Sequence, residues 1–216
     1  MRYNNIIPAK YIDRPNRFIA HVELDGKVET VHVKNTGRGT GVLIPDAEVY
    51  LTDTGTPNRK TRYDLVSARK SSGMMINIDS QAPNKAMKEW LENQDFDRVI
   101  PEFRYGNSRI DFYLEKKSEK YLMEVKGCTL EIDGVGYFPD APTDRGVRHL
   151  QELSKAAREG YHATLAFVIQ MESITEVRPN TAVHPAFGTA IEKAKESGVE
   201  ILMLPCHVEP DSLNIK

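Results

Sequence analysis

Two neighbouring stretches contain residues whose types and spacing could support chemistry on a phosphodiester. The first, Ser-Arg-Ile-Asp-Phe, contains Asp111, and the second, Tyr-Leu-Met-Glu-Val-Lys, ends on Glu124, Val125 and Lys126. Both are apolar and aromatic segments typical of strands, and the charged run between them suits a hairpin turn. Because side chains alternate faces along a strand, Glu124 and Lys126 point the same way and Val125 points into the core. We expect the partner strand to bring Asp111 to the same place.

Two carboxylates and a backbone carbonyl are the hard oxygen ligands that Mg²⁺ prefers. We predict that Asp111, Glu124 and the carbonyl of Val125 hold Mg²⁺, or Mn²⁺ in its place. Glu102, just before the Asp111 strand, is either a further ligand or a solvated strand residue. A bound metal would polarise the phosphodiester and help to generate hydroxide, and Lys126 would orient that water or offset charge on the phosphate. The predicted catalytic residues are Asp111, Glu124 and Lys126.

The same spacing also suits a strand without chemistry, since Glu-x-Lys is common on exposed strands as a salt bridge. An Asp, a spacer and then Glu-x-Lys nevertheless resembles the restriction-endonuclease-like nuclease superfamily. The dipeptide Pro139-Asp140 is not its Pro-Asp signature, because it follows Glu-x-Lys and Ile110 precedes the candidate acid.

Composition sets the limits on the class of protein. The 216 residues allow one large domain or two small ones, and the net charge is −2. Residues 1–80 hold 12 Lys or Arg against 9 Asp or Glu, net +3, whereas residues 81–216 hold 17 against 22, net −5. A mildly basic front half is compatible with phosphate contacts. Two distant cysteines exclude a zinc or disulfide framework. With no signal peptide and no apolar run long enough for a bilayer, we expect a cytoplasmic protein with no membrane partner.

The first half has the pattern of a small β-barrel. Residues 17–35 alternate around the turn pair Asp25-Gly26, which predicts a β-hairpin. Almost no helix signal interrupts the strands that follow. Several short strands with turns favour an OB-fold, which we place in residues 1–82. The further strands are expected over 48–52, 60–70 and 74–78.

Basic residues of this barrel are candidates for nucleic-acid contact. Arg38 lies at the tip of a glycine-rich loop, where it could touch a phosphate or simply occupy a turn that the glycines permit. Arg59, Lys60 and Arg62 stand beside Tyr63, and such a cluster can track a backbone and stack a base. It could equally be a charged edge strand that discourages aggregation.

The second half, residues 83–216, alternates between strands and helices, which predicts a mixed sheet flanked by helices. Asn84 is expected to cap the first helix, and the apolar run 163–169 reads as a central buried strand. On the second helix Arg145, His149 and Glu152 share one face, which could line a cleft and meet a phosphate or remain an exposed face with internal ion pairs. The predicted helices are 85–93, 143–159 and 186–197, and the predicted strands are 97–105, 109–115, 120–131, 162–170 and 199–204.

Several stretches of the sequence match one family. They follow one another in the family's order and span nearly the whole chain. The longest and most specific is Phe138-Pro-Asp-Ala-Pro-Thr-Asp-Arg-Gly146, and others include His32–Arg38, Tyr105–Phe112 and Phe167–Gln170. The chain thereby resembles the sugar fermentation stimulation protein A family. That resemblance implies an N-terminal OB-fold, a C-terminal restriction-endonuclease-like domain (PD-(D/E)xK), DNA binding and a regulatory role in sugar fermentation. One departure is His184-Pro185, where Asp-Pro is expected.

Two nucleic-acid functions stay open, beside a third interpretation as a scaffold that binds a small molecule or a protein. One is a DNA-binding protein with Mg²⁺-dependent phosphodiester hydrolysis, and the other is a non-catalytic DNA-binding regulator of sugar-metabolism genes. In both of these nucleic-acid functions, DNA or another nucleic acid is the expected partner. The nucleic-acid-binding residues would be Arg38, Arg59, Lys60, Arg62, Arg145 and His149.

Overall fold

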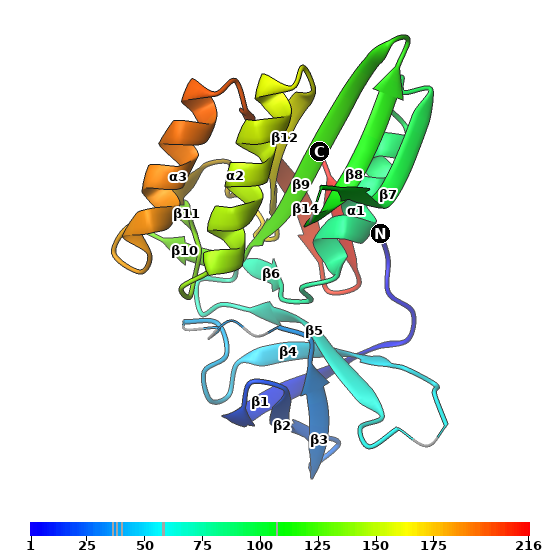
Figure 1. The fold of residues 1–216 in the computed structure, drawn as a ribbon. Coiled ribbons are helices and arrows are strands. Elements are labelled where there is room, and N and C mark those ends of the chain that lie inside the picture. The colour runs from blue at the N-terminus through cyan, green and yellow to red at the C-terminus, as the bar shows by residue number, and fades with distance from the viewer. Residues whose placement is uncertain (36, 38, 40, 58, 107) are drawn as a thin grey trace.

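The first half of the chain forms a β-barrel beneath a larger sheet with helices, as the computed structural model shows (Figure 1). The structure describes residues 1–35, 37, 39, 41–57, 59–106 and 108–216. The strands of the first half are β1 (Ile6–Asn16), β2 (Ile19–Leu24), β3 (Lys27–Val33), β4 (Glu48–Asp53), β5 (Tyr63–Arg69) and β6 (Met75–Asn77).

Five of these strands close the barrel. Their order is β3-β2-β1-β4-β5, and a parallel pairing of β3 with β5 joins the two ends. The hairpin predicted around Asp25-Gly26 is confirmed, and both turn residues have positive φ, as the tightest hairpin turns require. The sequence did not predict β1, which carries two prolines, and β5 begins at Tyr63 rather than at residue 60.

The second half is built on a six-stranded mixed sheet of order β15-β14-β12-β9-β8-β7. Its central strands β9, β12 and β14 are parallel, and a small sheet of β10, β11 and β13 lies beside it. The strands are β7 (Arg98–Tyr105), β8 (Ser108–Lys116), β9 (Glu119–Cys128), β10 (Leu130–Ile132), β11 (Val135–Phe138), β12 (His162–Ile169), β13 (Val177–Pro179), β14 (Glu200–Glu209) and β15 (Ser212–Ile215).

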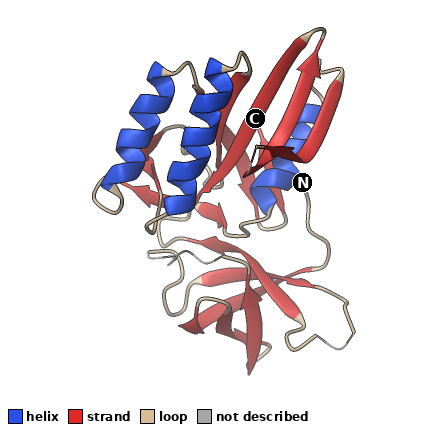
Figure 2. Ribbon diagram, in the orientation of Figure 1, coloured by secondary structure: helices blue, strands red, loops and turns tan. Residues whose placement is uncertain are grey.

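Helices cover both faces of this sheet (Figure 2). They are α1 (Ala82–Glu92), α2 (Asp144–Arg158) and α3 (Pro185–Glu196). Buried residues of α2 and α3 pack into one core with Leu122 and Leu165, whereas α1 packs on the opposite face with Phe112 and Val125. The core position predicted for Val125 is thus confirmed, and α1 and α2 approach β9 from opposite sides.

Three sequence predictions in this half need correction. Asn84 does not cap α1, because the helix begins at Ala82 with Gln81 as its N-cap and Pro83 in its first turn. The predicted strand 120–131 ends at Cys128. The last strand extends to Glu209 and continues into β15, a hairpin that the sequence did not predict.

Contacts between the two halves are polar as well as apolar. The side-chain amide of Gln170 is buried and donates to the carbonyls of Asn77 and Asp79, at 3.1 and 3.0 Å. The chain also begins in the second half, where the Met1 amino group donates to the carbonyl of Leu213 at 2.9 Å. In the described residues, no helix is both long enough and apolar enough to cross a membrane.

Candidate metal centre

Asp111 lies where β8 and β9 separate. The ladder between these strands is regular up to the pair Phe112 and Met123. Beyond this pair the backbone ladder stops, and the N–H of Val125 on β9 donates to the side-chain carboxylate of Asp111 on β8, at 2.8 Å. The other carboxylate oxygen accepts from the Asn84 side chain on α1 at 2.7 Å. Asp111 is therefore fixed in direct contact with the backbone next to Glu124.

Glu124 is 1% exposed on β9, beneath α2. Its Oε1 accepts from the Lys126 ammonium and from His149 on α2. Both side chains of the Glu-x-Lys pair thus face α2, as the alternation predicted. Its Oε2 is buried and has no hydrogen-bond partner among the described residues. A buried carboxylate oxygen without a partner is costly, so this atom and Asp111 fit a divalent cation.

His149 has a defined tautomer in this arrangement. The Arg145 Nε–H donates to His149 Nε2 at 3.2 Å. Arginine can only donate, so Nε2 is the unprotonated nitrogen and Nδ1 carries the proton that is donated to Glu124. The Lys126 ammonium lies 3.2 Å from the same Nδ1. Arg145 and His149 together orient Glu124 and leave its Oε2 unused.

The two carboxyl groups have opposite pKa shifts. Burial raises the pKa of Asp111, and the nearby charge of Glu124 raises it further. Burial also raises the pKa of Glu124, but the hydrogen bond from His149 and the charge and hydrogen bond of Lys126 outweigh burial, and its pKa falls below the usual value. Glu124 is thus held ionised, and a divalent cation would relieve its repulsion with Asp111.

The donor set is small. Among the described residues, no three His, Cys, Asp or Glu side chains are grouped to hold a metal. Glu102, proposed as a further ligand, is exposed and forms an ion pair with Arg109 at 3.0 Å. No described contact joins it to Asp111 or Glu124. The candidate ligands are therefore the carboxylates of Asp111 and Glu124, and the backbone carbonyl of Val125 stays a predicted third ligand.

The basic residues predicted on the barrel are mostly engaged within the protein. Arg59 donates to the buried Asp64 at 2.7 Å. Arg62 pairs with Asp53 and lies over the Tyr63 ring, 5.1 Å from its centroid. Lys60 is exposed, and Arg38 lies outside the described residues. Residues 59–62 precede β5 and are not part of an edge strand, so their role in nucleic-acid contact stays a prediction.

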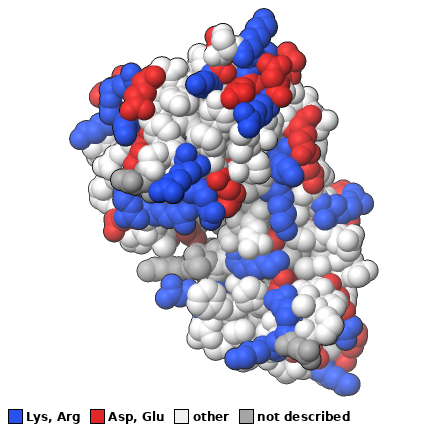
Figure 3. Space-filling view, turned by 45° about the vertical axis from the view of Figure 1, so that its right-hand side comes forward, with Lys and Arg blue, Asp and Glu red and all other residues white. Residues whose placement is uncertain are grey.

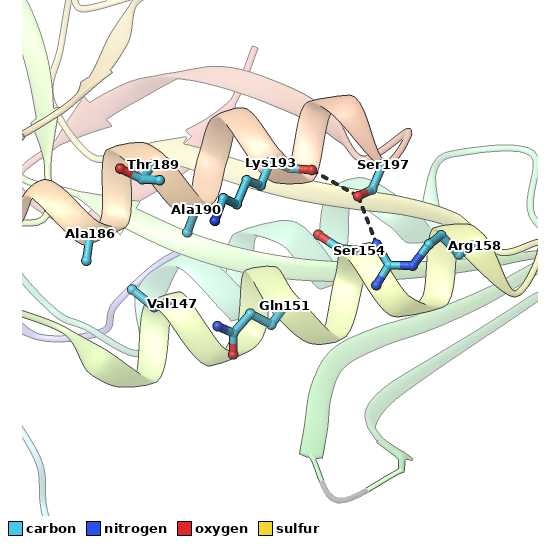
Figure 4. Close-up of a pocket in the computed structure, with 9 residues that line it drawn as sticks. All are labelled: Val147, Gln151, Ser154, Arg158, Ala186, Thr189, Ala190, Lys193 and Ser197. Atoms are coloured by element: carbon cyan, nitrogen blue, oxygen red, sulfur yellow. Dashed lines mark hydrogen bonds between the residues drawn. The ribbon is translucent and has the colours of Figure 1, made fainter.

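A groove of about 490 Å³ between α2 and α3 is separate from this site (Figure 4). It is lined by Val147, Gln151, Ser154 and Arg158 of α2, a different face of the helix from the one that carries His149. The face of α2 that carries His149 therefore points to β9. From the sequence we expected His149 to contact a phosphate, whereas in the structure it contacts Glu124. Asn84 was also missed as a site residue, because its position suggested a helix cap.

The architecture and this cluster define the class of protein. A closed five-stranded OB barrel precedes a mixed sheet of the restriction-endonuclease-like type. Residues 12–78 match the model of the SfsA N-terminal OB domain, and residues 81–212 match that of the sugar fermentation stimulation protein RE domain. The chain belongs to the sugar fermentation stimulation protein family.

Relatives match over the full length. The chain is 49% identical to a sugar fermentation stimulation protein homolog of Clostridium beijerinckii, with 100% of this chain and 97% of the relative covered. It is 50% identical to a homolog of Desulfitobacterium hafniense, with 99% and 94% covered. The structure of Pyrococcus furiosus SfsA in complex with Ca²⁺ matches with a TM-score of 0.87 at 29% identity, covering 100% of this chain and 95% of that one.

Proposed function

We propose that this protein is a metal-dependent phosphodiesterase that acts on DNA or another nucleic acid. The buried, unpartnered Oε2 of Glu124, close to Asp111 and Lys126, carries this proposal. Asp111, Glu124 and the carbonyl of Val125 would hold Mg²⁺ or Mn²⁺. When bound, such an ion polarises a phosphate and lowers the pKa of its water.

The remaining residues have supporting roles. Lys126 would place its ammonium beside the phosphate oxygens on which charge develops. Asn84 and the N–H of Val125 orient Asp111, and His149 orients Glu124. The similar protein of Pyrococcus furiosus was solved with Ca²⁺, a hard cation that takes oxygen ligands as Mg²⁺ does, which supports a divalent cation.

The charge distribution supports a nucleic-acid substrate. Lys and Arg side chains gather on the surface near the place where the two halves meet (Figure 3). Arg145 and Arg148 are exposed in the first two turns of α2, the helix that also carries His149. A phosphate chain close to Glu124 would therefore meet positive charge beside the site.

The test is cleavage of labelled single-stranded and duplex DNA and RNA with Mg²⁺, with Mn²⁺ and with a chelator. We expect metal-dependent cleavage that Glu124→Ala abolishes and Lys126→Ala reduces by at least about a hundredfold. Glu119→Ala is the matched control, because Glu119 is an exposed acid on the same strand. Cleavage that persists in Glu124→Ala would contradict the assignment.

A non-catalytic DNA-binding regulator of sugar-metabolism genes is the second candidate. The observation in its favour is that the Lys126 ammonium is already engaged by Glu124 and lies beside His149, so in this arrangement it is turned to the protein's own groups. It predicts DNA binding that weakens with salt and no cleavage with either metal. Cleavage that depends on Glu124 would reject it.

A further inference from the structure

The turn between β1 and β2 presents an aromatic ring to solvent. Phe18 is 49% exposed, and the guanidinium of Arg17 lies over its ring, 5.5 Å from the centroid. A single exposed phenylalanine is ordinary on a protein surface. A ring combined with an arginine, however, offers a stacking face and a positive charge together, which is the chemistry that a nucleotide uses. We call these two residues the Arg17–Phe18 platform.

The backbone of the platform is fixed before any ligand arrives. The side-chain oxygen of Asn16 accepts from the N–H groups of Phe18 and Ile19, at 2.9 and 3.1 Å. The carbonyl of Phe18 accepts from the N–H of Val33 on β3 at 2.8 Å. Because the turn is already ordered, binding a ligand on it costs little conformational entropy.

Arg14 connects the platform to the junction of the two halves. Its guanidinium donates to the carbonyl of Arg17 at 2.6 Å and to the carbonyl of Gly37 at 2.7 Å. Arg14 also lines one small pocket together with Thr129, three residues beyond Lys126. These contacts place the turn that carries the platform, through Arg14, next to the loop at Gly37 and to a residue that follows β9.

A second, polar pocket shares Thr129 with the first. Gly37 and Gly127, the residue after Lys126, line a cavity of about 160 Å³ between the barrel and the large sheet. A Cβ atom on Gly127 would lie 2.1 Å from the side-chain oxygen of Gln170. A side chain at position 127 would collide with Gln170, so the close approach of β9 to that residue requires glycine here.

We propose that the Arg17–Phe18 platform binds a single-stranded segment of the nucleic acid that occupies the candidate site, with one base stacked on Phe18 and a phosphate near Arg17. The direction of the strand, towards Lys126, rests on the proposed function. A base within a duplex has both faces already stacked, so an unpaired base suits an exposed ring. Arg17 forms no ion pair with any described residue, in contrast to Arg59 and Arg62.

The experiment measures binding of fluorescein-labelled single-stranded DNA, single-stranded RNA and duplex DNA to the full chain by anisotropy, in a chelator so that no cleavage occurs. We expect Phe18→Ala to weaken single-strand binding about fivefold to a hundredfold, and Phe18→Leu to weaken it similarly because the leucine cannot stack. Ile132→Ala is the control, since Ile132 is also 49% exposed but lies on β10. Circular dichroism confirms that each variant is folded.

A direct readout comes from Phe18→Trp, whose fluorescence a stacked base quenches. We expect quenching on addition of single strands and none on addition of a blunt duplex. The platform is rejected if the wild type retains no single strand at low salt or if Phe18→Ala binds as the wild type does. It is also rejected if Phe18→Leu preserves affinity, because the contact would then be apolar and would not involve stacking.

Failure of this inference and failure of the proposed function are distinguishable. Binding in chelator that depends on Phe18, without cleavage in Mg²⁺ or Mn²⁺, would reject the hydrolysis and keep the platform. Cleavage that depends on Glu124, with binding that ignores Phe18, would reject the platform alone.

Discussion

At the scale of single residues, the candidate site depends on which hydrogen bonds its carboxylates receive. Glu124 accepts two donors on one oxygen, whereas its second oxygen is buried without one. Asp111 receives one backbone and one side-chain donor. Buried polar atoms without a hydrogen-bond partner are found at active sites, because a bound ligand or metal ion then supplies the missing interaction.

His149 should contribute to stability as well as to the orientation of Glu124. In His149→Ala the buried carboxylate loses a donor, and we expect the free energy of unfolding to fall by about 1–3 kcal/mol, the usual cost of an unsatisfied buried group. Urea unfolding near neutral pH measures it. His162→Ala is the control, since the His162 side chain is 55% exposed, and should change stability by less than about 0.5 kcal/mol. Equal stability of the two variants would contradict this role.

At the scale of elements, the site is assembled by strands and helices that enter from different directions. Strand β9 supplies Glu124 and Lys126, β8 supplies Asp111, and helices α1 and α2 supply Asn84 and His149 from opposite faces of the sheet. The barrel is attached to this assembly by its own ion pair, between Lys70 after β5 and Glu131 on β10. Loss of that pair should loosen the contact between the barrel and the small sheet.

Glu131 makes this contact dependent on pH. The hydrogen bond from Lys70, with a second from the backbone of Gly134, holds the pKa of Glu131 below its usual value. An acid with a lowered folded-state pKa stabilises the fold above its unfolded-state pKa, and this contribution disappears as the pH falls through the folded-state pKa. Glu131→Gln should therefore be less stable than the wild type at neutral pH, and the difference should vanish in acid.

Urea unfolding of Glu131→Gln as a function of pH checks this expectation. Glu176→Gln is the matched control, because Glu176 pairs with Arg178 and both side chains are about half exposed, where ion pairs contribute little. A constant difference between Glu131→Gln and the wild type across the pH range would show that lost packing, and not the charge, is responsible.

At the scale of the whole molecule, buried polar contacts join the halves. Gln170 makes three hydrogen bonds to Asn77 and Asp79. In Gln170→Ala these three hydrogen bonds are lost, although Asn77 Oδ1 keeps the N–H of Asp79 and the Asp79 carbonyl keeps the N–H of Ala82, and we expect a cost of about 1–3 kcal/mol. We expect calorimetric unfolding to change from one transition to two, because the barrel and the sheet lose their coupling. Gln151→Ala, on the exposed surface of α2, should keep a single transition.

Much of the fold follows from local patterns in the sequence. The hairpin at Asp25-Gly26, the buried strand β12 and the helices α2 and α3 are predicted closely, because turn chemistry and hydrophobic period act within a few residues. Strand β1 escaped prediction because its two prolines argue against a strand unless the partner strands are known. The hairpin of β14 and β15 is likewise set by the sheet edge that it joins.

The sequence by itself determined the family, the two kinds of fold and the shared face of Glu124 and Lys126, since alternation along a strand is a local property. Only the tertiary structure decided that Asn84 and His149 reach the carboxylates, that Glu102 does not, and that Asp64 and Asp53 hold the arginines of the barrel. These contacts join residues on different elements. Their distances depend on how the sheet, helices and barrel pack, which no local pattern encodes.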